Sequence, residues 1–583
     1  MTGTFTFAVI SDTHIRALCG DQSSPYAVNE KANGRARYAV QLIAAEQPDL
    51  IIHLGDMVHP LPHMTAYLPA SEEAKKIFRP IASGLHFVPG NHDIGDKPSL
   101  VSPAGAPDET SLGRYGEAFG ESHYAFKHQD VNFVVMNSSL VNTGSEAEQA
   151  QRQWLETTLR AAKGEKIYLF SHYPPFICSA DEEDHYDNYA EPGRSWLLEL
   201  VAETGVEAVF SGHVHHFFAN THKGVTFYCY PATSFTRQDY AALFDGPVAP
   251  EFGRDDGGKF GVTMVDVTAE GHNFRFLPTF GRSLEEGESL PDDALSAPRN
   301  LSFLTPHLRH DWAGITSMPY NGPMEEFSRK QARDDYPLLR VKQLGIGRVR
   351  TTLKDLETAR RRARMDLWSD LGIRFVLSSI GLPDARAQTL LASHGRLVDS
   401  LDIAVPDFVS VNVDDVVDLA SRHPLWISKI TTSSSNQDPG RPFAHTVSCG
   451  ALPVEIDAAA AFMNSMPGSA SAKMVIQVPW GDDPAEVLSG WPLGLDRLVL
   501  NVRLAAGNPA LPNFDQQAIL KLLTDLSGIC ASHPLLEVAL DTFQDFDRGY
   551  HPRLGLVDGR SNIHEWLFDA GGLGGSLRRH GTG

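Results

Sequence analysis

VFSGHVHHFF, residues 209–218, begins as an apolar strand and runs directly into a group of histidines. Its first two residues are typical of a buried strand, but His213, His215 and His216 stand where turn residues are usual. Side chains two positions apart on an extended chain point the same way, so His213 and His215 can reach the same ligand. The stretch therefore predicts a buried sheet whose strand ends carry a reactive or metal-binding site.

The first half of the chain repeats this arrangement. Short apolar runs end in polar residues, and we expect strands at 5–10, 49–54, 85–88, 167–170 and 207–210. Helical patterns lie between them, at 148–163 and 195–204 among others. This alternation predicts a layered α/β domain, in which ligands gather beyond the carboxyl ends of the strands. The strand ends bring one set of side chains to that region: Asp12, His14, Asp56, Asn91, His92, His172, His213 and His215.

Imidazole and carboxylate groups together are the ligands of divalent first-row metals, and a set of this size suits two ions rather than one. Asp12 and His14 are two residues apart, as are His213 and His215, so each pair can reach a different ion or share one. Glycines at positions 55, 90 and 212 precede candidate ligands and allow the backbone to turn sharply there. The residues alone thus indicate a dinuclear metal site.

The candidate ligands fall into five motifs in a fixed order. They are D-T-H (12–14), G-D (55–56), G-N-H-D (90–93), H (172) and G-H-V-H (212–215). This series resembles the calcineurin-like metallophosphoesterases over about residues 5–280, and most of all their bacterial cyclic-nucleotide and glycerophosphodiester phosphodiesterase branch. The resemblance implies a four-layer α/β/β/α sandwich and the hydrolysis of small phosphodiesters.

The same resemblance implies which residues hold which ion. The ligands of one ion would be Asp12, His14 and His215. The ligands of the other would be Asn91, His172 and His213. Asp56 would bridge the two ions, which are expected to be divalent Mn, Fe, Zn or Co.

The expected chemistry is a metal-dependent hydrolysis. A hydroxide that bridges the ions would attack phosphorus in line, because bound metals lower the pKa of water. His92 matches the family histidine that contacts the phosphate and protonates the leaving oxygen. Asp93 is expected to orient that ring or a metal-bound water, and Asn91 joins His92 as a contact to the substrate.

Two further segments are candidates for the rim of the site. Residues 180–191 are acidic and aromatic, which fits either a substrate lid or a solvated loop. Residues 229–240 form a second candidate rim, in which Arg237 is the expected contact to a phosphate or substrate. Other histidines are not expected to bind metal: His53 belongs to the core and His216 is a neighbour of the motif. Surface or packing positions are expected for His59, His63, His86 and His185.

The second half of the chain predicts a separate domain. Residues 281–300 are rich in acidic residues, Ser, Pro and Gly and read as a linker, so the predicted domains are 1–280 and 301–583. Beyond the linker we expect strands at 312–317, 348–353, 374–380, 402–408 or 407–413, 426–431, 474–479, 497–504 and 536–541. About eight strands over this length fit a (β/α)₈-barrel-like domain, and an open doubly wound sheet is the alternative.

The role of this second domain stays open in the sequence. Polar residues stand near the expected strand ends: Lys429, Gln477, Asn501, Arg503, Asp541 and Arg548. No metal, phosphate-binding or nucleophile motif accompanies them. We therefore expect a substrate-shaping or oligomerisation domain, with a degenerate or second catalytic barrel as the alternative.

Composition limits the partners. A formal net charge of −22 opposes binding of a nucleic-acid polymer, and no apolar run is long enough to cross a bilayer. Five scattered cysteines fit reduced thiols in a cytoplasmic protein, and the oligomeric state stays open. The expected partner is a small phosphate ester. Two alternatives to a phosphodiesterase remain: a phosphomonoesterase or phosphonate monoester hydrolase, and a binding or scaffold protein with a vestigial site.

Overall fold

The computed structural model divides into two compact units, which are described separately. It describes residues 4–99, 102, 104–291, 294, 298–309, 311–320, 327–433, 446–505, 515–546 and 553–568. Unit 1 comprises residues 1–297 and 314–336, and unit 2 comprises residues 298–313 and 337–583. None of the helices in the described ranges is both long and apolar enough to cross a membrane.

Two mixed sheets form the centre of unit 1. The first has the order β11-β10-β1-β2-β3, with bounds His272–Pro278, Gly261–Val267, Phe5–Ile10, Leu50–His53 and Leu85–Phe87. The second has the order β4-β5-β6-β7-β9-β8, with bounds Tyr124–His128, Val131–Val135, Lys166–Phe170, Ala208–Ser211, Val225–Cys229 and Phe218–His222. In each sheet the three strands nearest the site, β1-β2-β3 and β5-β6-β7, run parallel. Their carboxyl ends therefore share one edge.

Aromatic side chains pack between the two sheets. The Phe7 ring of β1 lies 5.5 Å from Phe133 of β5 and 5.6 Å from Phe210 of β7, measured between ring centroids. The alternation of side chains along a strand explains this, since Phe7 points to one face and Ala8 to the other. The apolar residues on the inner faces thus join both sheets into one core.

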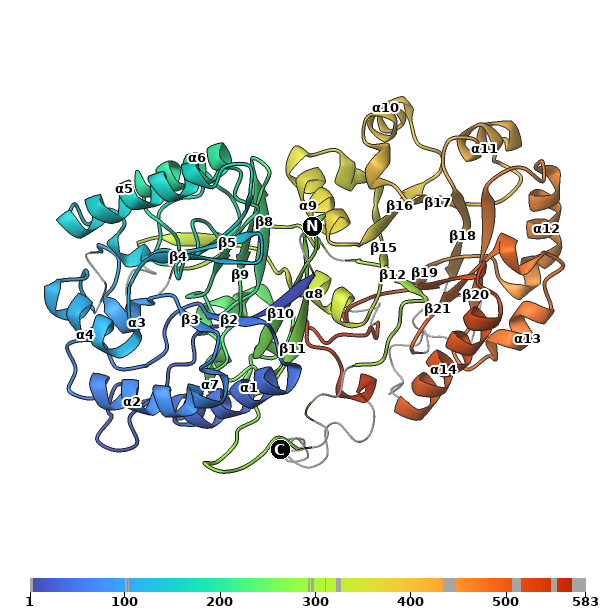
Figure 1. Cartoon of the computed structure of the whole chain (residues 1–583). Coiled ribbons are helices and arrows are strands. Elements are labelled where there is room, and N and C mark those ends of the chain that lie inside the picture. Colours follow the sequence, from blue (N-terminus) through green and yellow to red (C-terminus); the bar gives the residue numbers. More distant parts are fainter. Residues whose placement is uncertain are drawn as a thin grey trace. The chain divides into compact units, whose positions relative to one another are not determined.

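Helices cover the outer faces of these sheets (Figure 1). Helices α1 (Ala32–Glu46) and α2 (Tyr67–Phe78) share a core cluster with the first sheet, in which Ile43 and Ile77 join Ile10 and Ile51. Helices α5 (Glu146–Ala161) and α6 (Gly193–Thr204) share a second cluster with the other sheet. The shorter helices of this unit are α3 (Asn91–Ile94), α4 (Glu109–Phe119) and α7 (Pro250–Gly253).

The segment 314–336 belongs to unit 1, although the sequence placed it in the second domain. It contains the two-stranded sheet of β13 (Thr316–Pro319) and β14 (Arg329–Ala332). Met318 and Ala332 pack into a cluster with Ile177, Val214 and Tyr240. Part of the predicted linker is also packed, because the Leu290 amide donates to Gln41 of α1 at 2.9 Å. Sequence composition alone did not reveal these contacts.

Unit 2 is built on a nearly closed, barrel-like sheet of eight parallel strands. The order is β12-β22-β21-β20-β18-β17-β16-β15, and a bridge between His307 and Arg350 brings the two edge strands together. Strands β12, β15, β16 and β17 span Leu304–Pro306, Arg348–Thr352, Arg374–Ile380 and Ser400–Val405. Strands β18, β20, β21 and β22 span Leu425–Ser433, Ala472–Val478, Leu498–Val502 and Glu537–Leu540. Strand β19 (Thr446–Cys449) pairs with β18.

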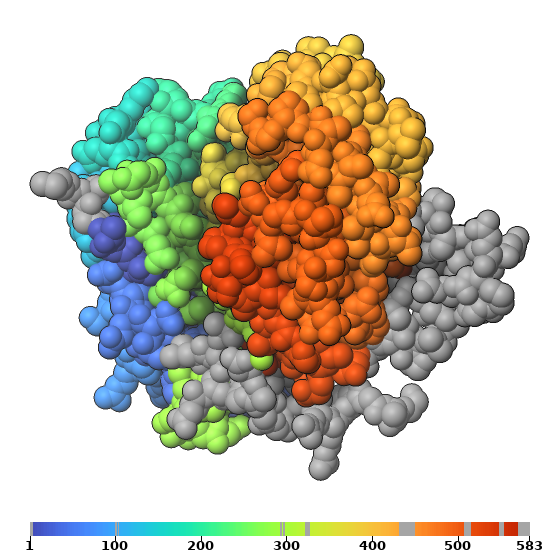
Figure 2. All heavy atoms as spheres, turned by 90° about the vertical axis from the view of Figure 1, so that its right-hand side faces the viewer, coloured from blue at the N-terminus to red at the C-terminus, as the bar shows by residue number. Residues whose placement is uncertain are grey.

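Helices alternate with these strands along the chain. They are α8 (Tyr336–Gln343), α9 (Ala359–Asp370), α10 (Ala385–Ser393), α11 (Val413–Ala420), α12 (Ile456–Ser465), α13 (Pro484–Ser489) and α14 (Gln516–Ser532). Residues of α12 to α14, orange in Figure 2, form much of the surface that faces the viewer there.

One predicted strand of this domain is wrong. The sequence placed the first strand at 312–317, but the barrel-like sheet begins with β12 at Leu304–Pro306, and Thr316 begins β13 in unit 1. Strand β12 has three residues, two of which are Thr305 and Pro306, so it lacks the apolar pattern that reveals longer strands.

Candidate metal centre

The predicted metal ligands lie at the carboxyl ends of the parallel strands of unit 1. Asp12 and His14 follow β1, Asp56 follows β2, and Asn91 begins α3 after β3. His172 follows β6, and the two remaining histidines follow β7. Five of these residues have a left-handed backbone, with φ between 45° and 67°: Asp12, His14, Asp56, His213 and His215. Such strain at several residues of one site is typical of a functional centre, because the fold must hold them against their preferred geometry.

The structure brings six of the seven residues into two groups that share the Asp56 carboxylate, and a third possible group joins His14 to His59 and His92. The members of the first group are Asp12, His14, Asp56 and His215. In it, His14 Nε2 lies 3.1 Å from His215 Nε2 and 3.5 Å from Asp56 Oδ2. The members of the second group are Asp56, His172 and His213. Asn91 joins this second group, since its Oδ1 lies 3.1 Å from His172 Nε2 and 3.0 Å from His213 Nδ1.

Hydrogen bonds on the far side of the rings orient them for a metal. His172 Nδ1 donates to the Leu54 carbonyl at 2.8 Å, and His215 Nδ1 donates to the Phe235 carbonyl at 2.7 Å. Each bond leaves the Nε2 lone pair directed at the centre of its group, as in metal-binding histidines generally. Among the described residues, Asp12 Oδ1 is buried without a hydrogen-bond partner and lies 3.2 Å from His215 Nε2. A buried carboxylate oxygen among imidazole nitrogens fits a cation.

The electrostatics of the group favour bound cations. Burial opposes ionisation of the Asp56 carboxyl, but the charges of His172 and His92 outweigh it and hold its pKa well below the usual value. Burial lowers the pKa of His14 and His213 well below the usual imidazole value, so both rings are neutral and offer lone pairs. Burial also lowers the pKa of His172, but the Asp56 charge outweighs it and raises that pKa to about 9. A dication beside Asp56 would compete with this proton.

Two of the predicted glycines are needed for different reasons. Gly55 has φ of 106°, which a side chain rarely adopts, so it provides the expected sharp turn before Asp56. Gly90 is needed because the backbone approaches closely, since a Cβ there would lie 2.1 Å from the Asp56 amide nitrogen. Both glycines therefore fix the position of the shared carboxylate.

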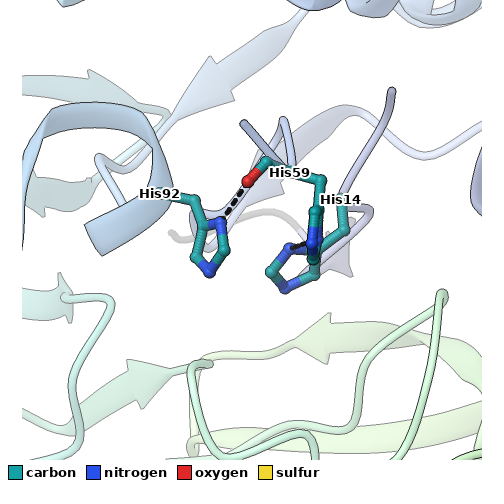
Figure 3. Close-up of side chains that lie close together, drawn as sticks. All are labelled: His14, His59 and His92. Carbon is teal, nitrogen blue, oxygen red and sulfur yellow. Dashed lines mark hydrogen bonds between the residues drawn. The ribbon is translucent and has the colours of Figure 1, made fainter. Parts of the chain in front are cut away.

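His92 lies at the edge of the two groups, with its backbone amide 2.8 Å from Asp56 Oδ1. Its Nδ1 donates to the backbone carbonyl of His59, which leaves Nε2 pointing away from His59 (Figure 3). The predicted partner Asp93 is fully buried and accepts from the amides of Gly90 and Val58 at 2.9 and 3.3 Å. Burial and the Asp56 charge raise the Asp93 pKa well above its usual value. An orienting role for Asp93 stays a prediction, and the contact that the structure shows for the His92 ring is with the His59 carbonyl.

His59 is the residue that the sequence analysis missed. It was expected at a surface or packing position, but only 8% of it is exposed and its Nδ1 lies 3.2 Å from His14 Nδ1. Its side chain thus contacts a candidate metal ligand while its carbonyl contacts His92 (Figure 3). If His14 Nε2 binds a metal, its Nδ1 carries the proton and donates to His59. The only signal in the sequence was that His59 stands three residues after Asp56.

The other histidines lie apart from these groups. His53 is fully buried beside Thr13, as expected for a core residue. His86 stacks on Phe126 with ring centroids 3.9 Å apart, and His63 is exposed. His185 is buried and lies 3.2 Å from Glu182, so packing rather than surface exposure describes it. His216 stacks on Tyr240, which agrees with a neighbour of the motif rather than a ligand.

The segment 180–191 lies against the candidate metal centre. Asp187 and Asn188 are fully buried, so this part is not a solvated loop. The Tyr186 ring packs on His213 with centroids 5.0 Å apart, and its hydroxyl lies 3.5 Å from the Asn91 amide nitrogen. The segment therefore forms part of the wall beside the second ligand group.

Arg237 contacts this wall instead of lying open to a substrate. Its guanidinium pairs with Asp187 and lies 3.1 Å from Asp239, and only 9% of its side chain is exposed. The described residues already provide two carboxylates for the charge of Arg237. The expected contact between Arg237 and a phosphate stays a prediction.

A buried ionic network connects this wall to the hairpin of β13 and β14. The Lys330 ammonium pairs with both Asp187 and Asp239, and 1% of its side chain is exposed. Asp187 Oδ1 in turn lies 3.8 Å from His213 Nε2. Two cations, Lys330 and Arg237, thus balance two carboxylates beside a candidate metal ligand. Through Lys330, a segment distant in sequence supports the metal centre.

Lys330→Met should therefore destabilise unit 1. The change leaves one cation for two buried carboxylates, and removing one partner of a buried ion pair costs about 3 kcal/mol or more. We expect a clear fall in the denaturation midpoint measured with urea. Lys76→Met is the matched control, because 68% of the Lys76 side chain is exposed and its ion pair at 3.7 Å contributes little. Equal midpoints for the two variants would contradict the account of the network.

Comparison with known proteins shows what this part of the chain is similar to. Residues 5–217 match the family model described as calcineurin-like phosphoesterase. The chain is 28% identical over 233 residues to the serine/threonine-protein phosphatase CPPED1 of Pongo abelii. That match covers 38% of this chain and 66% of the relative, so the chain spans just under two thirds of the relative's length.

Two further proteins each resemble about half of the chain. A probable cyclic nucleotide phosphodiesterase of Rhodococcus erythropolis is 25% identical over 300 residues, which cover 50% of this chain and 89% of that protein. The purple acid phosphatase PPD1 from yellow lupin, Lupinus luteus, matches in structure with a TM-score of 0.34 and 17% identity, over 47% of this chain and 52% of that one.

Proposed function

We propose that this chain, which carries a calcineurin-like phosphoesterase domain at residues 5–217, hydrolyses small phosphodiesters with the help of two divalent metal ions. One observation carries the proposal: Asp56 belongs to two groups of candidate ligands, and all members of these two groups are buried and follow strands of the two sheets. A carboxylate shared in this way is what a site for two neighbouring ions needs. Mn, Fe, Zn and Co all suit the mixture of imidazole, carboxylate and amide oxygen ligands.

Each residue of the site has a distinct part in this proposal. When bound, the two ions supply Lewis-acid chemistry that activates water and stabilises charge on the phosphoryl group. Asp56 holds the two ligand groups together, and its Oδ1 accepts the His92 amide. The His59 carbonyl fixes Nδ1 of His92, so Nε2 is the atom that gives a proton to the leaving oxygen. Tyr186 and Asp187 exclude water from the side of His213.

A phosphomonoesterase is the second candidate function. The phosphatase named among the relatives favours it, whereas the probable cyclic nucleotide phosphodiesterase favours the diester. We propose the diester because that relative matches over more of its own length, 89% against 66%. A phosphonate monoester hydrolase and a binding protein with a vestigial site remain as further alternatives.

Rates on three substrates distinguish these functions. In one metal-replete preparation we expect kcat/KM for bis(4-nitrophenyl) phosphate to exceed that for 4-nitrophenyl phosphate by about tenfold or more, which corresponds to about 1.4 kcal/mol. A higher value for the monoester, or for an aryl phosphonate monoester, would select that activity instead. If folded, metal-loaded protein hydrolyses none of these substrates, the remaining function is that of a binding protein with a vestigial site. The Asp56→Asn protein, purified identically, controls for contaminating phosphatases.

Several finer features belong to the same proposal. The contacts of α1, α2, α5 and α6 with the two sheets support a four-layer α/β/β/α sandwich for the first domain. Eight parallel strands alternating with helices support a (β/α)₈ barrel for the second. The partner is a small phosphate ester and not a nucleic-acid polymer, given the net charge of −22. None of the five cysteines, all of which lie among the described residues, forms a disulfide, which supports a reducing, cytoplasmic location.

A further inference from the structure

The inside of the barrel-like sheet in unit 2 changes from apolar to polar along its strands. Five inward residues from different strands form one apolar cluster: Val376, Trp426, Val475, Val499 and Ala539. Side chains two positions further along a strand share the same face. In all five cases that next residue is polar: Ser378, Ser428, Gln477, Asn501 and Asp541. The polar layer therefore lies on the carboxyl-terminal side of the apolar one.

One half of this polar layer is organised around Asp402 of β17. Its Oδ2 lies 3.1 Å from Arg350 Nη1 of β15, and its Oδ1 accepts from the Ser428 hydroxyl at 2.6 Å. The Ser378 hydroxyl donates to the same carboxylate at 3.3 Å. Asp402 and Arg350 are almost fully buried, so they form a buried ion pair inside the sheet.

The other half is organised around Asp541, which follows β22. Three arginines surround its single carboxylate: Arg309 pairs with Oδ1, Arg553 Nε lies 2.8 Å from Oδ2, and Arg503 Nε lies 3.6 Å from Oδ2. These charges outweigh the burial of Asp541 and hold its pKa below the usual value. Three guanidinium groups thus gather around one carboxylate in a chain whose net charge is −22.

The two halves lie close together. The Asn501 amide donates to the Cys449 carbonyl at 2.7 Å. Burial raises the pKa of the Cys449 thiol, and charges from both halves, Asp402 with Arg350 and Asp541 with Arg309, act on it. The layer thus brings four arginines and two aspartates to one end of the sheet.

Polar atoms of this layer are left for a ligand. Within the described residues, Arg350 Nε and Arg503 Nη2 are buried donors without a hydrogen-bond partner. The side chains of Arg309 and Arg503 keep 28% and 18% exposure, so the layer is open to solvent on their side. Lys429, which the sequence also suggested, pairs with Glu455, and Arg548 lies outside the described residues.

We propose that the carboxyl-terminal end of the barrel-like sheet is a second binding site, which takes a small oxyanion. Guanidinium groups present paired N–H donors that match the oxygens of a phosphate or carboxylate, and Arg309, Arg503 and Arg553 converge there. A purely structural barrel fills this layer with branched apolar side chains, whereas binding sites of such sheets lie at the carboxyl ends of the strands. The site is independent of the phosphoesterase activity.

Calorimetric titration of the full chain tests this proposal. The protein is treated with EDTA so that metal ions do not bind the anion in unit 1, and inorganic phosphate and succinate are titrated separately. We expect at least one of the two anions to bind with a stoichiometry of one per chain. Tighter binding of phosphate would indicate a phosphoryl ligand, and tighter binding of succinate would indicate a carboxylate ligand. Arg503→Gln should weaken binding by about tenfold or more, because a charge-assisted pair to the anion is lost.

Two further variants complete the test. Arg374→Gln is the matched control, because this arginine is 65% exposed at the start of β16 and pairs with Asp399. Asp541→Asn removes the carboxylate that competes with the anion, so affinity should rise even if stability falls. If neither anion binds, or if Arg503→Gln and Arg309→Gln bind like the unchanged protein, the proposal is overturned.

Discussion

Asp56→Asn should lower kcat/KM for an activated phosphodiester by about 10³-fold or more. Asp56 is the one carboxylate shared by both ligand groups, so its neutralisation weakens the binding of both ions at once. The Lewis-acid contribution of bound metals is several kcal/mol, and each 1.36 kcal/mol corresponds to tenfold in rate. The asparagine keeps an oxygen at Oδ1, so it can still accept the His92 amide and hold the local backbone.

Metal content and rate should be measured on the same Asp56→Asn sample. Asp266→Asn is the matched control, because this carboxylate lies on β10, is 41% exposed, and belongs to neither ligand group. It should keep its metal and its rate. Full activity of Asp56→Asn at the metal content of the unchanged protein would show that Asp56 does not hold the ions.

His92→Ala should lower kcat by roughly 10²- to 10⁴-fold on substrates with poor leaving groups, while metal content stays unchanged. The ring is held by the His59 carbonyl at Nδ1, and it is not a member of either group that contains Asp56. The loss should shrink for nitrophenolate, because a good leaving group needs little protonation. The ratio of the two losses therefore separates proton donation from phosphate binding.

His86→Ala provides the control for this second prediction. Its ring stacks on Phe126 and, among the described residues, belongs to none of the candidate ligand groups, so the rates of this variant should be unchanged for both kinds of substrate. Equal losses in His92→Ala for good and poor leaving groups would mean that His92 binds the phosphate and does not donate the proton.

The candidate metal centre could be predicted from the sequence because its ligands directly follow apolar strands. The pattern before Asp12, Asp56 and His213 defines buried parallel strands, and parallel strands place their carboxyl ends at one edge. The expected strand at 5–10 is β1 as observed, and that at 374–380 is β16 as observed. Local patterns were sufficient wherever a strand was long and apolar.

Contacts between distant segments could not be predicted. Lys330 reads as one surface lysine in a polar segment, and only the packed hairpin shows that it reaches Asp187 and Asp239. His59 lacked a motif of its own, although its carbonyl and ring both contact the site. Similarly, the three arginines around Asp541 come from separate loops, so their convergence follows from closure of the sheet.

The most direct test of the central claim is a metal titration of the purified chain. Metal-free protein is prepared with a chelator, Mn²⁺, Zn²⁺, Fe²⁺ or Co²⁺ is added in steps, and bound metal and diesterase rate are measured at each step. The account predicts an inactive metal-free protein whose activity returns and reaches its plateau at two bound ions per chain. Full activity without metal, or a plateau at one bound ion, would contradict it.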